Sequence, residues 1–312
     1  MFDSSLQRTR EIVGIPARQQ ELSARVARLA PVDGTHQSVL PCLALTRSSA
    51  PTVCMPTVYQ PCLGIVVQGR KRAVLNDEVF HYDALNYLVV SVTLPGMAQV
   101  VEATPEEPYL SLRLNLDLEE IARLVLELGD QRLSPPAADR GLFVARLDEP
   151  LLDAVLRMVK LLDTPQDIDV LTPLVQREIY YRMLRGELGY RLVDLAQTEG
   201  GNHRVVRAIE WLKQHYAAPL SIEELADSVH MSPSALHHRF KAITAMSPLQ
   251  FQKHLRLHEA RRLMFADGVE SAAAGHRVGY ESASQFSREY RRLFGAPPRS
   301  EIARLRETGA SA

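Results

Sequence analysis

Two segments near the carboxyl end of this 312-residue chain follow one pattern, and this repeat restricts the possible folds more than any other feature. Residues 221–241 and 272–292 each read as a helix, a tight turn and a second helix. Gly279 occupies the turn of the second copy, where a left-handed backbone reverses the chain. His230 takes that place in the first copy, and histidine tolerates this conformation better than most residues. The sequence therefore predicts two consecutive helix-turn-helix units.

The second helix of each unit has a predicted start. Ser232 precedes Pro233, so the hydroxyl can accept from unpaired amides while proline at the first helical position loses no hydrogen bond. Ser282 is placed to cap the second copy in the same way. In the preceding helices, Ala226 and Gly275 are small enough to let the two helices of a unit approach closely.

Each second helix also carries one apolar stripe, Leu236 with Phe240 in the first copy and Phe286 with Tyr290 in the second. Polar side chains then face outward, as they do in helices that enter the major groove of DNA. The candidate DNA contacts are Ser234, His237, His238, Lys241, Ala283, Ser284, Gln285, Ser287, Arg288 and Arg292.

A long helical pattern over residues 248–266 joins the two units. A continuous helix here would hold the two second helices at a fixed separation. Two DNA-contacting helices held by one long helix can enter the major groove at successive turns of the duplex, which lie about 34 Å apart.

Charge is divided unevenly along the chain. From Gly201 onward there are 16 Lys and Arg against 11 Asp and Glu, a balance of +5, whereas the preceding part has 20 against 26, or −6. A basic module beside an acidic one suits a protein that binds the phosphate backbone through one half only. A basic surface of this size is equally consistent with ordinary solvation.

The N-terminal part has a different sequence pattern, with short runs of residues typical of β-strands separated by Pro and Gly. Asn76-Asp77 predicts a hairpin turn and Pro95-Gly96 a second turn. Seven short strands in about 80 residues are typical of a small barrel or a double-sheet jelly roll. The predicted strands are 42–46, 63–68, 72–75, 78–82, 86–92, 98–103 and 109–116.

Helical patterns flank these strands at 16–29, 117–128, 148–162 and 173–185. Residues 1–10 give little signal. When a helix packs on a sheet and an apolar stripe remains uncovered, that stripe commonly contacts a second copy in a dimer. The alternative is that these stripes only cover the barrel of their own chain. Residues 191–202 are the expected linker, and a helix over 203–216 begins the C-terminal module.

The C-terminal motifs, taken together, resemble those of AraC-type transcriptional regulators. The matching motifs are Leu225-Ala226, Met231-Ser232-Pro233-Ser234, Phe240-Lys241, Ser247-Pro248, Leu255-Arg256-Leu257, Glu259-Ala260-Arg261-Arg262-Leu263, Val278-Gly279-Tyr280, Ser284-Gln285-Phe286-Ser287-Arg288, Phe294-Gly295 and Pro297. This resemblance implies that the polar faces of the two second helices contact DNA bases.

The N-terminal part is similar to the cupin-like domain of one branch of this family. The similarity rests on Val58-Tyr59-x-Pro61, Val67-Gln68-Gly69-Arg70-Lys71, Tyr87-Leu88-Val89-Val90-Ser91-Val92, Leu94-Pro95 and Glu107-Pro108-Tyr109. Such domains sense a small molecule and dimerise. The expected fold is therefore α+β, with a cupin-like β-barrel or jelly roll and flanking helices, followed by an all-α domain with two helix-turn-helix motifs joined by a long helix. The expected divisions are an extension with a helix (1–34), an effector-binding and dimerisation domain (35–190), a linker (191–202), a DNA-binding domain (203–306) and a tail (307–312).

The candidate effector contacts are Tyr59, Cys62, Gln68, Arg70 and Lys71. Residues 68–71 offer a polar floor with two cations for an anionic ligand, and a solvated hairpin edge is the competing interpretation. A thiolate at Cys54 or Cys62 would react with electrophiles or oxidants, but buried cysteines are mostly inert.

The sequence gives little support to enzymatic chemistry. A metal-binding cupin needs several histidines and a glutamate, and His81 is the only histidine between residues 38 and 116. The spacing of the three cysteines fits neither a zinc ribbon nor a redox pair. We therefore expect no catalytic residue, metal site or cofactor. The alternatives are a cupin-type metal-dependent enzyme, or a constitutive DNA binder without a ligand.

The expected partners are double-stranded DNA, an unidentified small-molecule effector, a second copy of the chain in a homodimer, and RNA polymerase. No run of 18 apolar residues is present, so no membrane association is expected. The predicted location is the bacterial cytoplasm, in association with the nucleoid.

Overall fold

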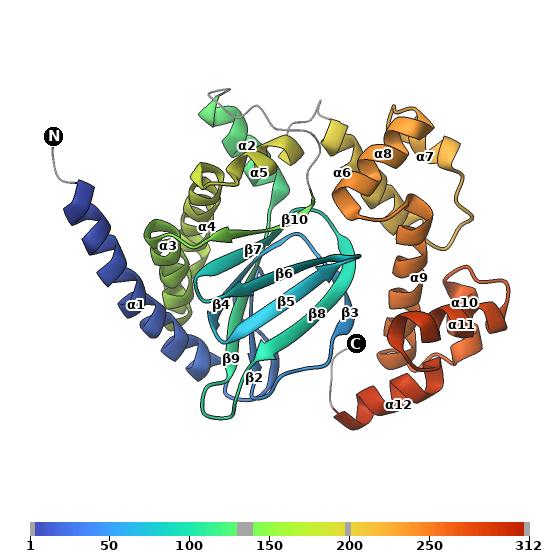
Figure 1. Cartoon of the computed structure of the whole chain (residues 1–312), viewed down its shortest axis with the longest axis horizontal. Coiled ribbons are helices and arrows are strands. Elements are labelled where there is room, and N and C mark those ends of the chain that lie inside the picture. Colours follow the sequence, from blue (N-terminus) through green and yellow to red (C-terminus); the bar gives the residue numbers. More distant parts are fainter. Residues whose placement is uncertain (1–3, 130–139, 197–200, 309–312) are drawn as a thin grey trace.

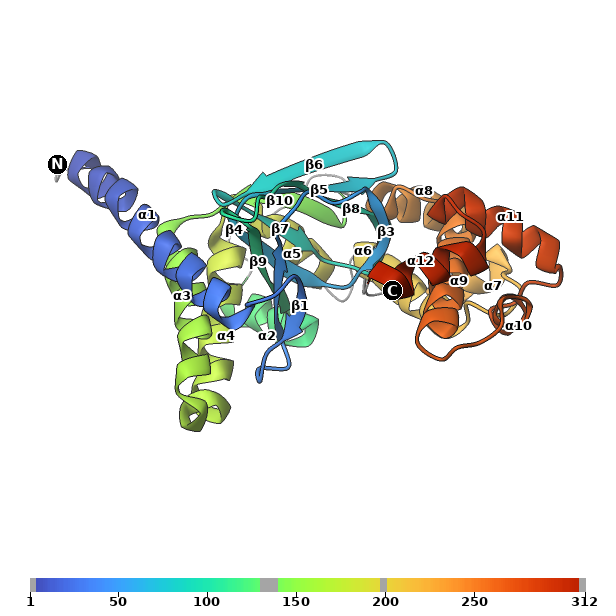
Figure 2. The ribbon, with the colours of Figure 1, turned by 90° about the horizontal axis from the view of Figure 1, so that it is seen from below.

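The computed structural model describes residues 4–129, 140–196 and 201–308. A β-rich N-terminal domain is followed by an all-helical C-terminal domain (Figure 1). The first helix, α1 (Ser4–Leu29), lies on the opposite side of the β-rich domain from the C-terminal helices in both views (Figures 1 and 2).

Two antiparallel sheets form the N-terminal domain and do not close into a barrel, so of the two predicted forms the jelly-roll-like double sheet is found. One sheet has the order β1 (Gly34–Gln37), β2 (Leu43–Ser48), β9 (Tyr109–Asn115), β4 (Cys62–Gln68), β7 (Asn86–Val90) and β10 (Leu142–Arg146). The other has the order β3 (Met55–Tyr59), β8 (Leu94–Glu102), β5 (Arg70–Leu75) and β6 (Glu78–Asp83).

All seven predicted runs form strands, and the hairpin turn at Asn76-Asp77 is confirmed by the pairing of Leu75 with Glu78. The turn predicted at Pro95-Gly96 is wrong, because β8 continues through both residues and pairs with β3. The pairing of β8 with β5 extends only to Met97, so the missing amide of Pro95 costs nothing on that side. A side chain at position 96 would lie 2.9 Å from the carbonyl oxygen of Val74, so glycine is needed for close strand approach.

Alternation along the strands separates two hydrophobic cores. In β4, Leu63, Ile65 and Val67 face the core shared with helices α1 to α5. Cys62 and Val66 face the opposite way, toward the four-stranded sheet. This second core continues into the C-terminal domain, so the two domains share buried apolar surface.

The helices after the sheets are α2 (Leu118–Leu128), α3 (Glu149–Lys160), α4 (Ile168–Arg185) and α5 (Gly189–Ala196). Side-chain carboxylates of Asp117 and Asp148 accept from backbone amides at the starts of α2 and α3, which explains where these helices begin. The linker predicted over 191–202 does not begin at residue 191, because residues 191–196 belong to α5. The reason is that Leu192 and Val193 are buried in the first core. Residues 197–200 lie outside the described ranges.

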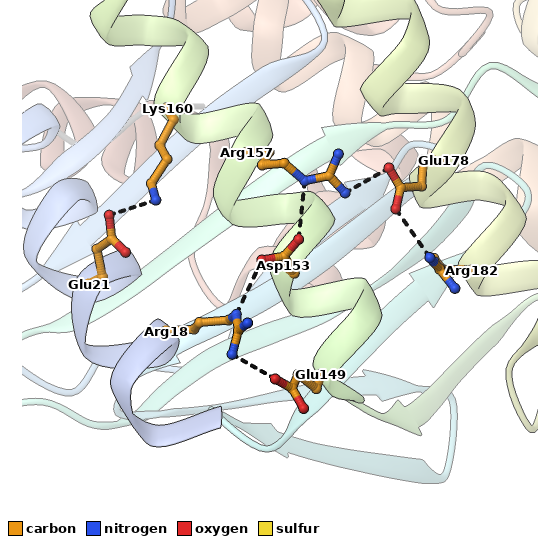
Figure 3. Close-up of polar contacts among 8 residues, drawn as sticks. All are labelled: Arg18, Glu21, Glu149, Asp153, Arg157, Lys160, Glu178 and Arg182. Atoms are coloured by element: carbon orange, nitrogen blue, oxygen red, sulfur yellow. Dashed lines mark hydrogen bonds and ion pairs between the residues drawn. The ribbon is translucent and has the colours of Figure 1, made fainter. Parts of the chain in front are cut away.

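Helix α1 begins at Ser4, earlier than the pattern over 16–29 predicted. Leu22 and Val26 are fully buried against the first core. Ion pairs add to this contact on the surface, where Arg18 reaches Glu149 at 2.6 Å and Lys160 reaches Glu21 at 2.9 Å (Figure 3). Because exposed pairs contribute little, the buried leucine and valine hold α1 in place.

The C-terminal domain contains α6 (Gly201–Gln214), α7 (Ile222–Ser228), α8 (Pro233–Thr244), α9 (Pro248–Phe265), α10 (Ser271–Arg277), α11 (Ala283–Phe294) and α12 (Pro298–Thr308). Helices α7 and α8 form one helix-turn-helix unit and α10 and α11 the other, with α9 between them, as predicted. The expected tail begins inside α12, and residues 309–312 lie outside the described ranges.

Candidate functional site

The first helix-turn-helix unit is built as the sequence predicts. His230 adopts a left-handed backbone with φ 56°, and the Ser232 hydroxyl accepts from the amide of Ala235 at 3.2 Å. Phe240 is fully buried and meets the ring of Phe251 edge-on, with ring centroids 5.3 Å apart. These contacts fix α8 against α9 and leave its opposite face to solvent.

The second unit relies on two glycines. Gly279 has φ +90°, and a Cβ there would lie 2.1 Å from the carbonyl oxygen of Ala217. A Cβ on Gly275 would lie 2.9 Å from the ring of Phe286, so glycine permits the close packing of α10 on α11. The Ser282 hydroxyl caps α11 by accepting from the Gln285 amide at 3.3 Å.

The polar faces of α8 and α11 lie at the surface. Nine of the ten candidate DNA contacts are exposed and Ser287 is half-buried. The exposed residues are Ser234, His237, His238, Lys241, Ala283, Ser284, Gln285, Arg288 and Arg292. We refer to α8 and α11 as the first and second reader.

Other arginines of this domain have structural roles. Arg256, on α9, donates to the carbonyl oxygens of Ala218 and Gly279, each at 2.9 Å, and so ties the α6–α7 connection and the turn of the second unit to α9. Arg261 forms a buried ion pair with Glu301 at 2.9 Å. The arginines of the second reader instead point outward, where a phosphate or a base edge can reach them.

A second candidate site lies between the two sheets of the N-terminal domain. This sheet cavity has a volume of about 240 Å³. It adjoins a larger space of about 940 Å³ that shares Lys71 and Arg113 and is also lined by residues of α9, among them His258. The polar residues of the sheet cavity include Tyr59, Gln60, Cys62, Lys71, Tyr82, Tyr109 and Arg113.

The sheet cavity is electropositive. Lys71 and Arg113 both line it, and no carboxylate is among its lining residues within the described ranges. Burial lowers the pKa of Lys71, and Arg113 lowers it further, since an ammonium without a carboxylate partner is costly to enclose. The Lys71 ammonium lies 5.9 Å from the centre of the Tyr109 ring. An anionic group bound here would relieve the repulsion between the two cations.

Comparison with known proteins identifies the family of this chain. The family model for the AraC-type transcriptional regulator N-terminus matches residues 39–191, and a helix-turn-helix domain model matches residues 225–304. The chain belongs to the AraC-type transcriptional regulators. This is a family of regulators and not of enzymes.

Among similar proteins, this AraC-type regulator is 29% identical over 154 residues to the HTH-type transcriptional activator RhaS of Escherichia fergusonii. That match covers 49% of the chain and 55% of RhaS, so the chain spans about half the length of the curated relative. ToxT of Vibrio cholerae is similar in structure, with a TM-score of 0.59 at 10% identity, covering 84% of this chain and 97% of ToxT. A second ToxT structure, from strain SCE256 with a bound unsaturated fatty acid, has a TM-score of 0.56 at 8% identity and covers 90% and 100%. These likenesses to ToxT show the fold alone.

The five candidate effector contacts of the AraC-type regulator fall in different places. Tyr59, Cys62 and Lys71 line the sheet cavity. Gln68 lies on the outer side, where its amide donates to the Pro108 carbonyl at 2.8 Å. Arg70 forms a surface ion pair with Glu102 at 3.1 Å. Arg70 and Lys71 are consecutive residues of β5, so their side chains point to opposite faces of the sheet and the two cations do not form one floor.

Sequence reasoning missed Arg113, Tyr82 and Tyr109 as cavity residues. For Tyr109 and Arg113, the signal that could have found them is the alternation within the predicted strand 109–116, whereas Tyr82 lies in the predicted strand 78–82. Leu110, Leu112 and Leu114 face the helical core, so the odd-numbered residues between them face the other sheet.

Two cysteines of the AraC-type regulator, Cys62 and Cys42, are in surroundings that do not favour a thiolate. Burial raises the pKa of Cys62 to about 11, so this thiol is protonated at neutral pH. Burial also raises the pKa of Cys42. Across the described ranges, no three His, Cys, Asp or Glu side chains gather as a metal-binding group. Within the same ranges, no helix is long and apolar enough to cross a membrane.

Proposed function

We propose that this protein is a sequence-specific DNA-binding transcriptional regulator controlled by a small-molecule effector bound in the N-terminal domain. The observation that carries the proposal is the pair of capped readers, fixed to one continuous helix, with polar exposed faces. Helices with this geometry enter the major groove of DNA, and basic side chains at their edges contact phosphates.

The effector of this proposal is an anion with an apolar body. The two cations and three tyrosines of the sheet cavity suit a carboxylate attached to a hydrocarbon, and one structural neighbour, ToxT, has been solved with an unsaturated fatty acid bound. Tyr59, Cys62 and Lys71 are the proposed contacts predicted from sequence, and Arg113 joins them. The effector acts by changing the placement of the readers relative to the N-terminal domain.

A homodimer is part of the same proposal. Exposed apolar side chains on α2 and α4 offer surface for a second copy, namely Leu126, Leu128, Val170, Leu171 and Leu174. Sedimentation of the purified protein tests this. Action in the bacterial cytoplasm and contact with RNA polymerase complete the proposal, and transcription of a bound promoter with purified polymerase tests the latter.

Selection of duplexes from a random library, followed by affinity measurement, tests DNA recognition. Arg288→Ala should weaken binding to the selected duplex by about 1–3 kcal/mol if the guanidinium reads a base. Arg299→Ala is the matched control, because Arg299 is an exposed arginine of α12 outside both readers. The proposal fails if the wild-type protein selects no sequence above the background of the library.

Loss of the Lys71 cation tests the effector site. Lys71→Met should abolish the thermal stabilisation that an unsaturated fatty acid, for example oleate, gives the wild-type protein, because the methionine side chain fills similar space without charge. Oleyl alcohol is the matched ligand control, since it keeps the hydrocarbon and lacks the carboxylate. Arg70→Met is the protein control, since Arg70 lies outside the cavity. Equal stabilisation by the acid and the alcohol would contradict an anion site, and a DNA affinity that no ligand changes would favour a constitutive binder.

A further inference from the structure

The N-terminal domain is hydrogen-bonded to the last turn of the first reader. Arg140 donates through Nη1 to the carbonyl oxygens of Lys241 at 3.1 Å and Ala242 at 2.5 Å. The amide of Gly141 donates to the carbonyl oxygen of Ile243 at 3.0 Å. The last four carbonyls of a helix need partners from outside its own ladder, and cations are favoured at this end. Here those partners come from a different domain.

The same arginine holds the β5–β6 hairpin. Its Nε and Nη2 donate to Oε1 of Glu78, at 2.8 Å and 2.5 Å, and Glu78 is the first residue of β6 after the turn. One guanidinium therefore joins three elements, which are the hairpin, the segment leading into β10 and the end of α8. We call Asn76, Asp77, Glu78, Arg140 and Gly141 the latch.

The tip of the hairpin lies in front of both readers. Asn76 lines a cavity of about 670 Å³ whose opposite wall is the polar face of α8, with Ser234, His237, His238 and Lys241. It also lines a cavity of about 280 Å³ with Arg292 of the second reader. Both ribbon views show the β5–β6 turn directed at the C-terminal domain (Figures 1 and 2).

This position conflicts with a bound duplex. A reader helix lies inside a major groove about 12 Å wide, with a phosphate backbone on either side of it. Asn76 and the polar face of α8 line the same cavity, so the hairpin tip stands where a phosphate backbone would approach the first reader. The tip also carries the carboxylate of Asp77, which would repel phosphates approaching the same basic face, whereas the charge of Glu78 is paired with Arg140.

We infer that the latch is an autoinhibitory contact, and that the first reader binds DNA only after the Arg140 bonds to α8 have broken. The inference rests on the proposed function and assigns a regulatory role to residues outside both the DNA face and the sheet cavity. The docked arrangement is the DNA-free state. Effector binding acts by favouring or opposing the release of α8.

Removal of the Arg140 side chain tests the latch. Arg140→Ala should raise affinity for a duplex selected by the wild-type protein by at least about fivefold without effector, the lower end of usual coupling between sites. Glu78→Gln should act in the same direction with a smaller effect, because the hairpin loses its charge pair and the bonds to α8 remain. Arg146→Ala is the matched control, since Arg146 is an exposed arginine at the end of β10, the strand that follows Arg140.

A second measurement does not depend on affinity. The Gly141 amide, which donates across the domain boundary, should exchange its hydrogen faster in Arg140→Ala and in the DNA complex than in the DNA-free wild type. Equal DNA affinity of wild type and Arg140→Ala, both folded by circular dichroism, overturns the latch and leaves the proposed function intact. Retained protection of the Gly141 amide in the DNA complex also overturns it. If the wild-type protein and Arg140→Ala both bind no sequence, the proposed function fails and the latch with it.

Discussion

At the scale of single residues, His258 shows how burial affects a titratable group. Its Nε2 is buried without a hydrogen-bond partner in the described part of the chain, and its ring meets Phe294 edge-on. Burial, together with the nearby His254 and Arg261, lowers the pKa of His258 from 6.5 to about 3. The folded protein therefore keeps this imidazole neutral at pH values where the unfolded chain would protonate it.

This difference predicts acid sensitivity. The stabilisation linked to His258 is complete above pH 6.5 and is lost progressively as the pH falls toward 3, because the unfolded state binds the proton more tightly. Between pH 7.5 and pH 5, His258→Gln should lose about 1–2 kcal/mol less unfolding free energy than the wild type, measured by urea titration. His276→Gln, at an exposed histidine, should lose as much as the wild type. Equal losses in all three proteins would contradict the buried neutral state.

Residue-level predictions from sequence succeeded where the cause is local. The caps at Ser232 and Ser282 and the left-handed turn at His230 depend on neighbouring atoms, and all three are confirmed. Alternation along a strand indicates which face a side chain is on, but which side chains share the sheet cavity depends on strand pairing, which a linear pattern does not fix. Lys71 was therefore found while its partner Arg113 was missed.

At the scale of elements, the two turns of the repeat both need a residue with a left-handed backbone, and each uses a different residue type, His230 in the first and Gly279 in the second. Gly279 has no steric alternative, because a Cβ would lie 2.1 Å from a backbone oxygen, whereas His230 accepts a left-handed backbone with a full side chain.

Exchange at these turns should have opposite effects. Gly279→Ala should destabilise the domain by more than about 1 kcal/mol, since both the backbone and the Ala217 carbonyl must shift. His230→Gly should be neutral or stabilise by up to about 1 kcal/mol, because glycine adopts this conformation without strain. Midpoints of urea unfolding measure both changes. Tolerance of alanine at 279 without loss would show that the turn is not closely packed.

The strands β1, β3 and β10 were not predicted. Of these, β10 is a short apolar run, whereas β1 and β3 lack a clear alternation of apolar residues. The segment Gly34–Gln37 has no apolar side chain, and Met55–Tyr59 contains Pro56, so neither resembles a strand in isolation. Each forms because a neighbouring strand supplies its hydrogen bonds, β2 for the first and β8 for the second. Such edge strands depend on pairing more than on their own composition.

At the scale of the whole molecule, the two-domain organisation could be predicted and the docking of the domains could not. The repeat and the β-rich texture each lie within one part of the chain. The contact of Arg140 with α8 joins residues 102 positions apart, and nothing in the local sequence around either partner indicates it. Long-range pairing of this kind is specified by the assembled surface.

The last turn of α8 is bound to the N-terminal domain through Arg140, whereas among the residues that the structure describes α11 has no such contact with the latch. The two helix-turn-helix units should therefore differ in how readily they bind a duplex. Helix α11 presents most of its polar face away from the hairpin. In the DNA-free state, by contrast, the last turn of α8 is bound to Arg140 and the polar face of α8 lies opposite the hairpin tip. Occupancy of a two-part operator should therefore have an order, with the half facing α11 filled first. At low protein concentration a hydroxyl-radical footprint should cover that half alone and extend to the other as concentration rises, whereas simultaneous protection of both halves would indicate readers of equal availability.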